Sequence, residues 1–189
     1  MSNSKYELIA DKTIDVFGRK LFRIRALNSF GSVNAGDEGG YVESESNLSD
    51  KGNAWVYGDA RVYGDARVYG DARVFGNARV FGNAWVSGNA WVSGNARVSG
   101  NAQVFGNAWV SGNARLSERS AIFWASNVGS EFGTLTVFRC ESGIGVRRGC
   151  FFGTPEDFLA AVEQKHGADS KIGREYHLLM QVALSRVSE

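Results

Sequence analysis

The side chains in this sequence that are best equipped to bind a ligand are arginines placed at a fixed interval. Arg61, Arg79, Arg97 and Arg115 follow one another every 18 residues. If three six-residue repeats complete one turn of a coil, these four guanidinium groups stack in a row, about 5 Å apart. Like charges at this spacing repel one another modestly in water, and a bound anion or acidic surface would relieve that repulsion. The row is therefore a candidate anion site.

Two aromatic residues accompany the arginines. Tyr63 and Phe81 stand beside Arg61 and Arg79 at the same 18-residue spacing. Arginine next to an aromatic ring is suited to a phosphate attached to a base, as in a nucleotide. The alternative is that the arginines are ordinary surface residues whose aliphatic stems pack on the two rings.

A second row at the same spacing is aromatic. It contains Trp55, Trp91 and Trp109, with Arg73 between the first two and with Tyr57 and Phe75 beside them. So much aromatic surface facing outward predicts a protein–protein interface, most simply self-association. Stacking on a sugar or a base is a second interpretation, and covering of the rings by the terminal segments is a third.

Both rows depend on a very regular repeat. The unit A-x-V-x-G-[ND] recurs every six residues, and Val56 is the first member of a column that ends at Leu116. Ala and Val are two positions apart, so they share one face of a short strand. Gly followed by Asn or Asp favours a tight corner, because these residues tolerate positive φ. The pattern predicts short strands joined by two-residue corners, since a helix would need a period near 3.6.

This array resembles the hexapeptide-repeat family, which folds as a left-handed parallel β-helix with three hexads per turn. The resemblance implies a mainly β chain with a solenoid over residues 48–128. Ile122 and Val128 extend the valine column in degraded form, and Leu48 precedes it. Eighteen-residue stacking also places an asparagine on each corner aspartate: Asn77 on Asp59, Asn83 on Asp65, and Asn89 on Asp71. This avoids stacked carboxylates and allows hydrogen-bonded asparagine ladders.

Two different segments flank the array. Residues 1–47 read as a β-rich cap for the first open edge of the solenoid. In residues 129–189, two apolar runs around the turn ESG predict a β-hairpin that leaves Cys140 and Cys150 unbonded to each other. A helix is expected to begin after Thr154 and end at Gly167, and a second helix follows. This ββαα segment resembles the tail of hexapeptide-array proteins of phage and prophage origin.

The resemblance also raises the question of catalysis. Hexapeptide solenoids include acyltransferases that use a histidine of the coil and carbonic anhydrases that need three metal-binding histidines. This chain has only His166 and His177, and both fall in the predicted C-terminal helices. We therefore expect no catalytic residues, no metal and no cofactor. An acyltransferase-like enzyme stays an alternative only if one of these histidines reaches the coil surface.

The composition narrows the remaining classes. The 21 basic and 20 acidic residues nearly cancel, so a nucleic-acid partner is not expected. The sequence has no apolar stretch long enough to predict a membrane span. Two cysteines are too few for a disulfide framework, which favours a cytoplasmic protein. The leading interpretation is a non-catalytic binding or scaffold protein that self-associates as a dimer or trimer, in a phage or prophage setting. The alternative is a protein that sequesters a small anionic ligand.

Overall fold

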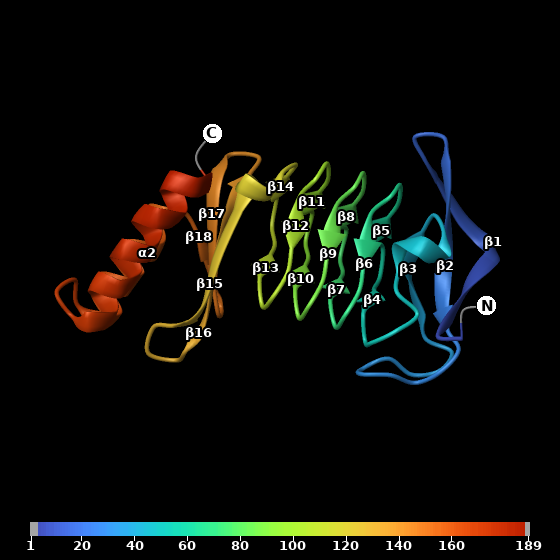
Figure 1. The fold of residues 1–189 in the computed structure, drawn as a ribbon, viewed down its shortest axis with the longest axis horizontal. Coiled ribbons are helices and arrows are strands. Elements are labelled where there is room, and N and C mark those ends of the chain that lie inside the picture. The colour runs from blue at the N-terminus through green and yellow to red at the C-terminus, as the bar shows by residue number, and fades with distance from the viewer. Residues whose placement is uncertain (1–3, 188–189) are drawn as a thin grey trace.

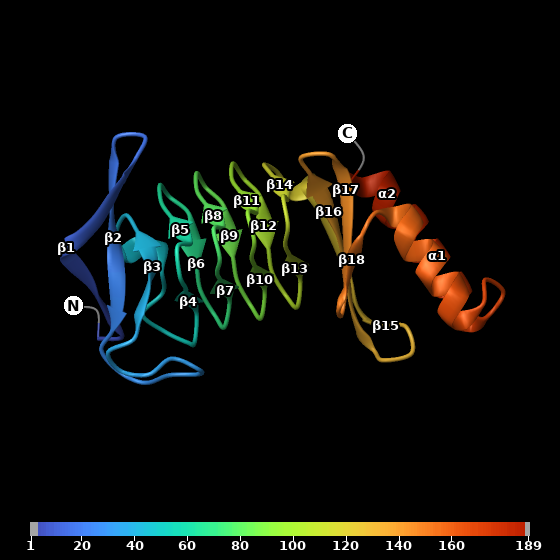
Figure 2. The ribbon, with the colours of Figure 1, turned by 180° about the vertical axis from the view of Figure 1, so that it is seen from behind.

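The computed structural model describes residues 4–187 and shows an elongated molecule with a β-solenoid in the middle. A β-hairpin covers one end, and a small sheet with two helices covers the other (Figures 1 and 2). The expected mainly β fold is confirmed at this level: a solenoid of about four turns, an N-terminal β region, and a C-terminal antiparallel sheet with two helices.

The solenoid consists of two-residue strands, one in each repeat. They are β4 (Trp55–Val56), β5 (Arg61–Val62), β6 (Arg67–Val68), β7 (Arg73–Val74), β8 (Arg79–Val80), β9 (Trp85–Val86), β10 (Trp91–Val92), β11 (Arg97–Val98), β12 (Gln103–Val104), β13 (Trp109–Val110) and β14 (Arg115–Leu116). Each strand pairs in parallel with the strand 18 residues further along, for example Arg61 with Arg79 and Arg79 with Arg97. Three repeats therefore complete one turn and give the coil three faces. The Ala and Val columns point inward, and from Ala54 to Leu116 they are at most 1% exposed.

The corners between strands are stabilised in the way the sequence predicts. The first corner residue is a glycine with positive φ, such as Gly88 at 64°, where an added Cβ would meet Gly106 N at 2.9 Å. Glycine is needed there because no side chain fits between two coils stacked this closely. The asparagine ladders are also present: Asn77 donates to Asn95 Oδ1 at 3.3 Å, and Asn53 donates to the Asp71 carboxylate at 2.8 Å.

The N-terminal region continues one sheet of the solenoid. β1 (Tyr6–Val16) and β2 (Arg19–Ala26) form an antiparallel hairpin, and β2 pairs with β3 (Glu38–Val42). β3 then pairs in parallel with β5, so a seven-stranded sheet runs from the hairpin along one side of the coil to β14. The hairpin is thus joined to the solenoid by backbone hydrogen bonds as well as by side chains.

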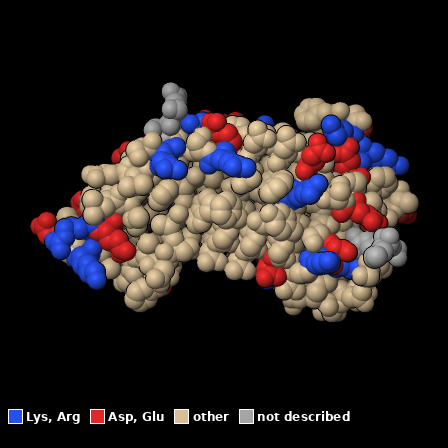
Figure 3. Space-filling view, viewed as in Figure 1, with Lys and Arg blue, Asp and Glu red and all other residues tan. Residues whose placement is uncertain are grey.

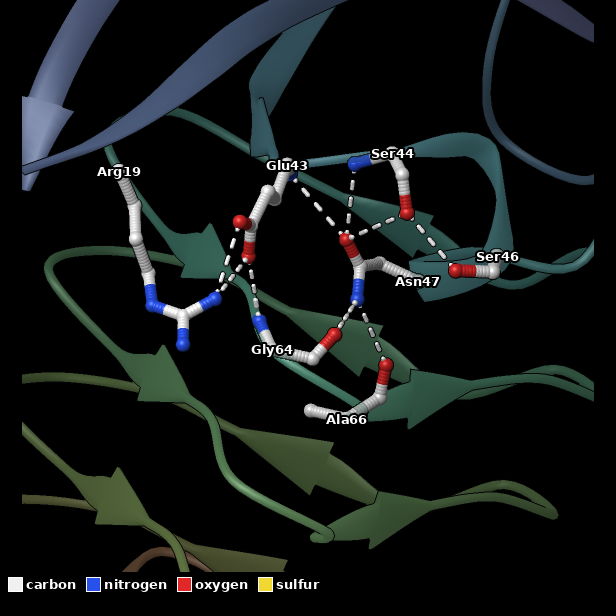
Figure 4. A network of polar contacts seen from close by, with 7 residues as sticks. All are labelled: Arg19, Glu43, Ser44, Ser46, Asn47, Gly64 and Ala66. Carbon is white, nitrogen blue, oxygen red and sulfur yellow. Dashed lines mark hydrogen bonds and ion pairs between the residues drawn. The ribbon is translucent and has the colours of Figure 1, made fainter.

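The first turn of the solenoid would expose a row of backbone carbonyls, and the segment before it satisfies them. Backbone N–H groups of Tyr41, Glu43 and Ser49 donate to the carbonyls of residues 60, 62 and 68. The short helix η1 (Glu45–Asn47) interrupts this backbone pairing between Glu43 and Ser49, and the side-chain amide of Asn47 donates the hydrogen bonds there instead. Its Nδ2 donates to Gly64 O at 2.8 Å and to Ala66 O at 2.9 Å (Figure 4).

The side-chain oxygen of Asn47 and the carboxylate of Glu43 complete the cap. Asn47 Oδ1 accepts hydrogen bonds from the backbone N–H groups of Glu43 and Ser44, at 3.1 and 2.9 Å. The Glu43 carboxylate accepts from Gly64 N at 2.7 Å and also holds Arg19 (Figure 4). Side chains therefore replace the backbone of the missing preceding turn, which is how the open edge is closed.

The C-terminal end of the coil is closed by a second sheet. It contains β15 (Ile122–Val128), β16 (Gly133–Cys140), β17 (Gly143–Arg148) and β18 (Phe151–Gly153), all antiparallel and in that order. β16 lies across the last turn: Thr136 Oγ1 accepts from Trp109 N at 3.1 Å, and Ala114 bridges to Cys140. The fully buried Phe138 belongs to the solenoid core and fills its end.

Residues Ile122 and Val128, expected in the valine column, lie outside the regular coil. Both belong to β15, which follows the short helix η2 (Arg119–Ala121) and pairs antiparallel with β16. The reason is local: no glycine occurs between Gly112 and Gly129, so the corners of the coil cannot form. The unbroken run Ile122–Ala125 favours one longer strand instead.

Two helices complete this end, as predicted. α1 (Pro155–His166) begins at Thr154, whose hydroxyl accepts from Asp157 N, and ends at Gly167 with φ of 81°. α2 (Lys171–Val187) packs Tyr176, Met180 and Ala183 on the sheet. Within the described residues no helix has the length and apolar character of a membrane span.

The cysteines are unbonded, as predicted. Cys140 is half-buried next to the last turn of the coil, and burial raises the pKa of its thiol above the usual value. Cys150 is exposed in the turn between β17 and β18.

Candidate functional site

The tryptophan face is the side of the coil formed by β4, β7, β10 and β13. Its register is as expected, because each residue pairs with the one 18 positions away: Trp91 pairs with Trp109 on one side and with Arg73 on the other. The expected outward exposure of Trp55 is wrong, because the ring is 1% exposed. Tyr6 and Phe30 contact it edge-on at centroid distances of 6.1 and 5.4 Å, so the N-terminal region covers this end of the face.

The other end of the tryptophan face is covered by the C-terminal sheet. The Arg147 guanidinium lies 3.7 Å from the centre of the Trp109 ring, and Trp109 in turn contacts Trp91 at 5.2 Å. Phe75 is half-buried and packs edge-on against Trp91 at a centroid distance of 5.9 Å. Tyr57 is half-buried and its hydroxyl lies 3.2 Å from Ser32 Oγ. Most of the aromatic area of this face is therefore used within the chain.

The arginine face is formed by β5, β8, β11 and β14, and the predicted row is present. Arg61, Arg79, Arg97 and Arg115 are consecutive partners in one sheet. Arg115, at the C-terminal end, is engaged: it donates to Glu141 at 2.9 Å and to the Asn95 carbonyl at 3.2 Å. Among residues 4–187, no carboxylate forms an ion pair with the other three arginines.

The two rings beside this row are stacked in parallel. The Tyr63 and Phe81 centroids are 5.1 Å apart with an interplanar angle of 4°. Tyr63 is covered by Val16 and Leu21 of the hairpin, and burial raises the pKa of its phenol. Positive charge from Arg79, Arg97 and Arg61 acts on that pKa in the opposite direction. The two rings therefore lie beside the arginine row as one stacked pair that packs on the hairpin.

The third side of the coil is the open face, which we define by Arg67, Tyr69, Trp85, Gln103 and Phe105 on and beside β6, β9 and β12. Tyr69, Trp85 and Phe105 are 38%, 41% and 45% exposed, so this is where the solenoid shows its aromatic rings to solvent. Tyr69 contacts Trp85 edge-on at 6.4 Å, and Phe105 contacts Trp124 of β15 at 4.4 Å. The terminal regions border this face and leave its centre uncovered.

Sequence reasoning did not select the open face. Its columns read Arg67, Trp85 and Gln103 before the valine, and Tyr69, Ser87 and Phe105 after it. The signal was available, because the same 18-residue spacing places Tyr69, Trp85 and Phe105 on one side. Counting tryptophans favoured the other face, where the rings turn out to be covered.

The repeats match a known family. The model described as YdcK Beta solenoid repeat matches residues 54–70, 60–74, 66–80, 72–88, 78–94, 90–104 and 102–118. The central coil is thus similar to the YdcK β-solenoid repeat over residues 54–118. A comparison with curated proteins gives no match. The match covers the coil and none of the residues of the two end regions.

Charge is unevenly distributed around the solenoid. On the side shown in Figure 3, most charged side chains lie over the two ends of the molecule, and the middle is largely uncharged. Shallow grooves on the open face are lined by Trp85, Gln103 and Phe105, and Glu118 and Arg119 border them at the C-terminal end. This combination of aromatic and neutral polar groups suits contact with another protein surface.

The two histidines lie away from the solenoid. His166 ends α1, and His177 is on α2, and both helices pack on the side of the C-terminal sheet opposite to the coil (Figures 1 and 2). Both ring nitrogens of His177 have partners, Gly173 O at 2.9 Å and Glu163 at 3.1 Å. Neither histidine reaches the coil surface within this chain.

Proposed function

We propose that this protein is a non-catalytic binding and scaffold protein, and that its open face is the surface through which it self-associates. The observation that carries the proposal is the exposure of Tyr69, Trp85 and Phe105 at the centre of a face that both end regions leave uncovered. Contiguous exposed aromatic surface on a folded chain is typical of an interaction site.

A second copy of the chain is the partner that the charges of this face favour. Arg67 lies at the N-terminal end and is exposed, without an ion-pair partner among the described residues. Glu118 lies at the C-terminal end, where its carboxylate pairs with Arg139 at 3.2 Å while its side chain stays 55% exposed. A two-fold rotation that reverses the coil axis places Arg67 of one copy opposite Glu118 of the other, with the aromatic rings between them. Such a contact is self-complementary, as a dimer interface must be.

The size of the open face predicts how strong this association is. Three strands at normal spacing make a face only about 14 Å long. A stable dimer buries about 800 Å² per partner, so the three strands alone fall short of that value. The borders contributed by Trp124 and η2 enlarge the contact. We therefore expect a reversible dimer whose population depends on protein concentration.

Removing the two most exposed rings of the open face should abolish the dimer. For Trp85→Ser combined with Phe105→Ser we expect a monomer at concentrations where the wild-type protein is dimeric, because buried aromatic rings dominate interface energies. Sedimentation velocity over a concentration series measures this directly. Phe17→Asn is the matched control, since Phe17 is 86% exposed in the β1–β2 turn, away from the open face. An unchanged dimer in the double variant would contradict the proposal.

A second candidate function is binding of a small anion on the arginine face. It is favoured by three stacked arginines, Arg61, Arg79 and Arg97, with which no carboxylate of residues 4–187 forms an ion pair, and by the stacked rings of Tyr63 and Phe81 in the neighbouring column. In the turn of Arg61 the neighbouring corners carry Asp59 and Asp65, whereas the corners near Arg79 and Arg97 carry asparagine. Positive charge is therefore least balanced in the middle of the row. Such a site would suit a ligand-sequestering protein.

This candidate predicts a measurable affinity for inorganic triphosphate at low salt. Arg79→Gln and Arg97→Gln should each weaken binding by about tenfold, because a charge-assisted hydrogen bond contributes about 1.5–3 kcal/mol. Arg67→Gln removes an equivalent arginine of the open face and should leave the affinity unchanged. Isothermal titration calorimetry measures all three. Equal affinities for the wild-type protein and the two variants would exclude the arginine face as an anion site.

The proposal also includes the hand of the coil, the biological setting of the protein and the absence of catalysis. The left hand of the coil is inferred from its resemblance to hexapeptide-repeat proteins. The phage or prophage setting is inferred from the resemblance of the ββαα tail. The absence of catalysis is supported by the position of His166 and His177 behind the C-terminal sheet, where neither can act as a base on the coil.

A further inference from the structure

The C-terminal region contains a pocket that the proposed function does not use. It has a volume of about 260 Å³ and lies between α1, the β15–β16 turn and the β17–β18 turn. Its floor is apolar: Phe158 contacts Phe151 at 5.4 Å and Tyr176 at 5.2 Å, both edge-on, and the buried Val162 lies beside them. An aromatic floor of this kind holds the apolar body of a small ligand.

The rim of the pocket carries positive charge. Arg148 is fixed in place, because its Nε donates to the Tyr176 hydroxyl at 2.9 Å and its Nη2 donates to Val128 O at 3.3 Å. The Arg148 side chain is only 12% exposed, while Lys165 on α1 is 66% exposed. His166 also lines the rim. A largely buried guanidinium at the edge of a pocket is suited to a carboxylate.

One carboxylate already lies between these cations, and it is held loosely. Glu131 is 3.7 Å from Arg148 Nη1 and 3.6 Å from Lys165 Nζ, both longer than a hydrogen bond. Its side chain is 67% exposed. The turn that carries it is anchored separately, since Gly129 N donates to Glu175 at 3.0 Å. The Glu131 side chain can therefore swing away without any movement of the backbone.

We propose that this pocket binds a small amphipathic monocarboxylate, with its apolar body on Phe158 and its carboxylate between Arg148 and Lys165. The ligand carboxylate takes the position of Glu131, which turns outward to solvent. The charge balance favours a monoanion, because two cations face the pocket and one loosely held carboxylate competes for them. The volume limits the ligand to roughly ten to fifteen non-hydrogen atoms.

The test uses 3-phenylpropanoate and its neutral amide with the full-length protein. We expect 3-phenylpropanoate to bind with a Kd on the order of 0.1–1 mM, which is typical of a ligand of this size. Glu131→Gln should tighten its binding about fivefold, because a competing charge at about 4 Å is removed. Lys165→Gln should weaken its binding by a similar factor. The amide should bind more weakly and should not respond to Glu131→Gln.

Two-dimensional amide NMR titration measures the affinities and places the ligand. Shifts should centre on Cys150, Phe158 and Val162, and Ala161→Phe, which narrows the pocket, should remove them. Glu131 is exposed, so the Glu131→Gln variant is expected to fold normally. The proposal is overturned if 3-phenylpropanoate causes no shifts at these residues. It is also overturned if the acid and the amide bind equally in both proteins. None of these outcomes depends on self-association through the open face.

Discussion

Trp55→Ala is expected to lower the free energy of unfolding by about 3–5 kcal/mol, the usual range for deleting a fully buried tryptophan. The ring is 1% exposed and lies between Tyr6, Phe30 and the first turn of the coil. Its loss leaves a cavity where the N-terminal hairpin meets the solenoid. Urea unfolding followed by circular dichroism measures the effect, and hydrogen exchange at residues 60–68 shows whether the first turn opens.

Trp85→Ala is the matched control for this prediction. Trp85 occupies the same position of the repeat as Trp55, directly before the valine, but it is 41% exposed. Its loss should cost less than about 1 kcal/mol in a dilute, monomeric sample, because a ring this exposed gains little from folding. Equal destabilisation by the two substitutions would contradict the view that the N-terminal region uses Trp55 as its anchor.

Asn47→Asp is expected to destabilise the first turn by roughly 3 kcal/mol or more at neutral pH. The substitution keeps the shape of the side chain and removes both of its donors. Gly64 O and Ala66 O would lose their partners, and a carboxylate would face two carbonyl oxygens at a site that is 0% exposed. The cost combines two unsatisfied acceptors with a buried, unpaired charge.

The pH dependence of this variant has a definite sign. Burial next to carbonyl oxygens raises the pKa of the new carboxyl group in the folded state above its unfolded value. The folded state then binds more protons, so the penalty shrinks as the pH falls and grows as the pH rises through that pKa. Urea midpoints at pH 4.5 and pH 7 for the variant and the wild type measure the difference.

Asn95→Asp is the control for the buried site. Asn95 is an exposed corner residue that still accepts from Asn77 after the change and loses only a 3.5 Å bond to Asn113. Its stability should change by less than about 1 kcal/mol. If the Asn47 variant were no less stable than this control, the amide of Asn47 would not be closing the open edge of the coil.

The central coil could be predicted from the sequence because its determinants are local. A period of six with Gly and Asn at fixed positions specifies strand, corner and core in every repeat, and the asparagine ladders follow from the 18-residue stacking. The valine column alone predicts a coil that continues to Val128, because Ile122 fits the column, whereas the last strand of the coil is β14. The missing corner glycines decide its true fold, since without them the chain forms β15.

The surfaces could be predicted only in part, because exposure depends on long-range docking. The arginine row and its register follow from spacing alone, and the structure adds that Arg115 is engaged with Glu141. The covering of Trp55 depends on Tyr6 and Phe30, which are far away in sequence and carry no pattern that links them to the coil. No local signal marks which of three similar faces the end regions leave open.

Hydroxyl-radical footprinting of the wild-type protein at low and high concentration tests the proposed role of the open face most directly. We expect Tyr69, Trp85 and Phe105 to be labelled at low concentration and protected at high concentration. Phe17 and Phe132, which are 86% and 73% exposed, should be labelled equally at both. If the protein dimerises while Trp85 stays fully labelled, another surface forms the contact and the open face is not the interface.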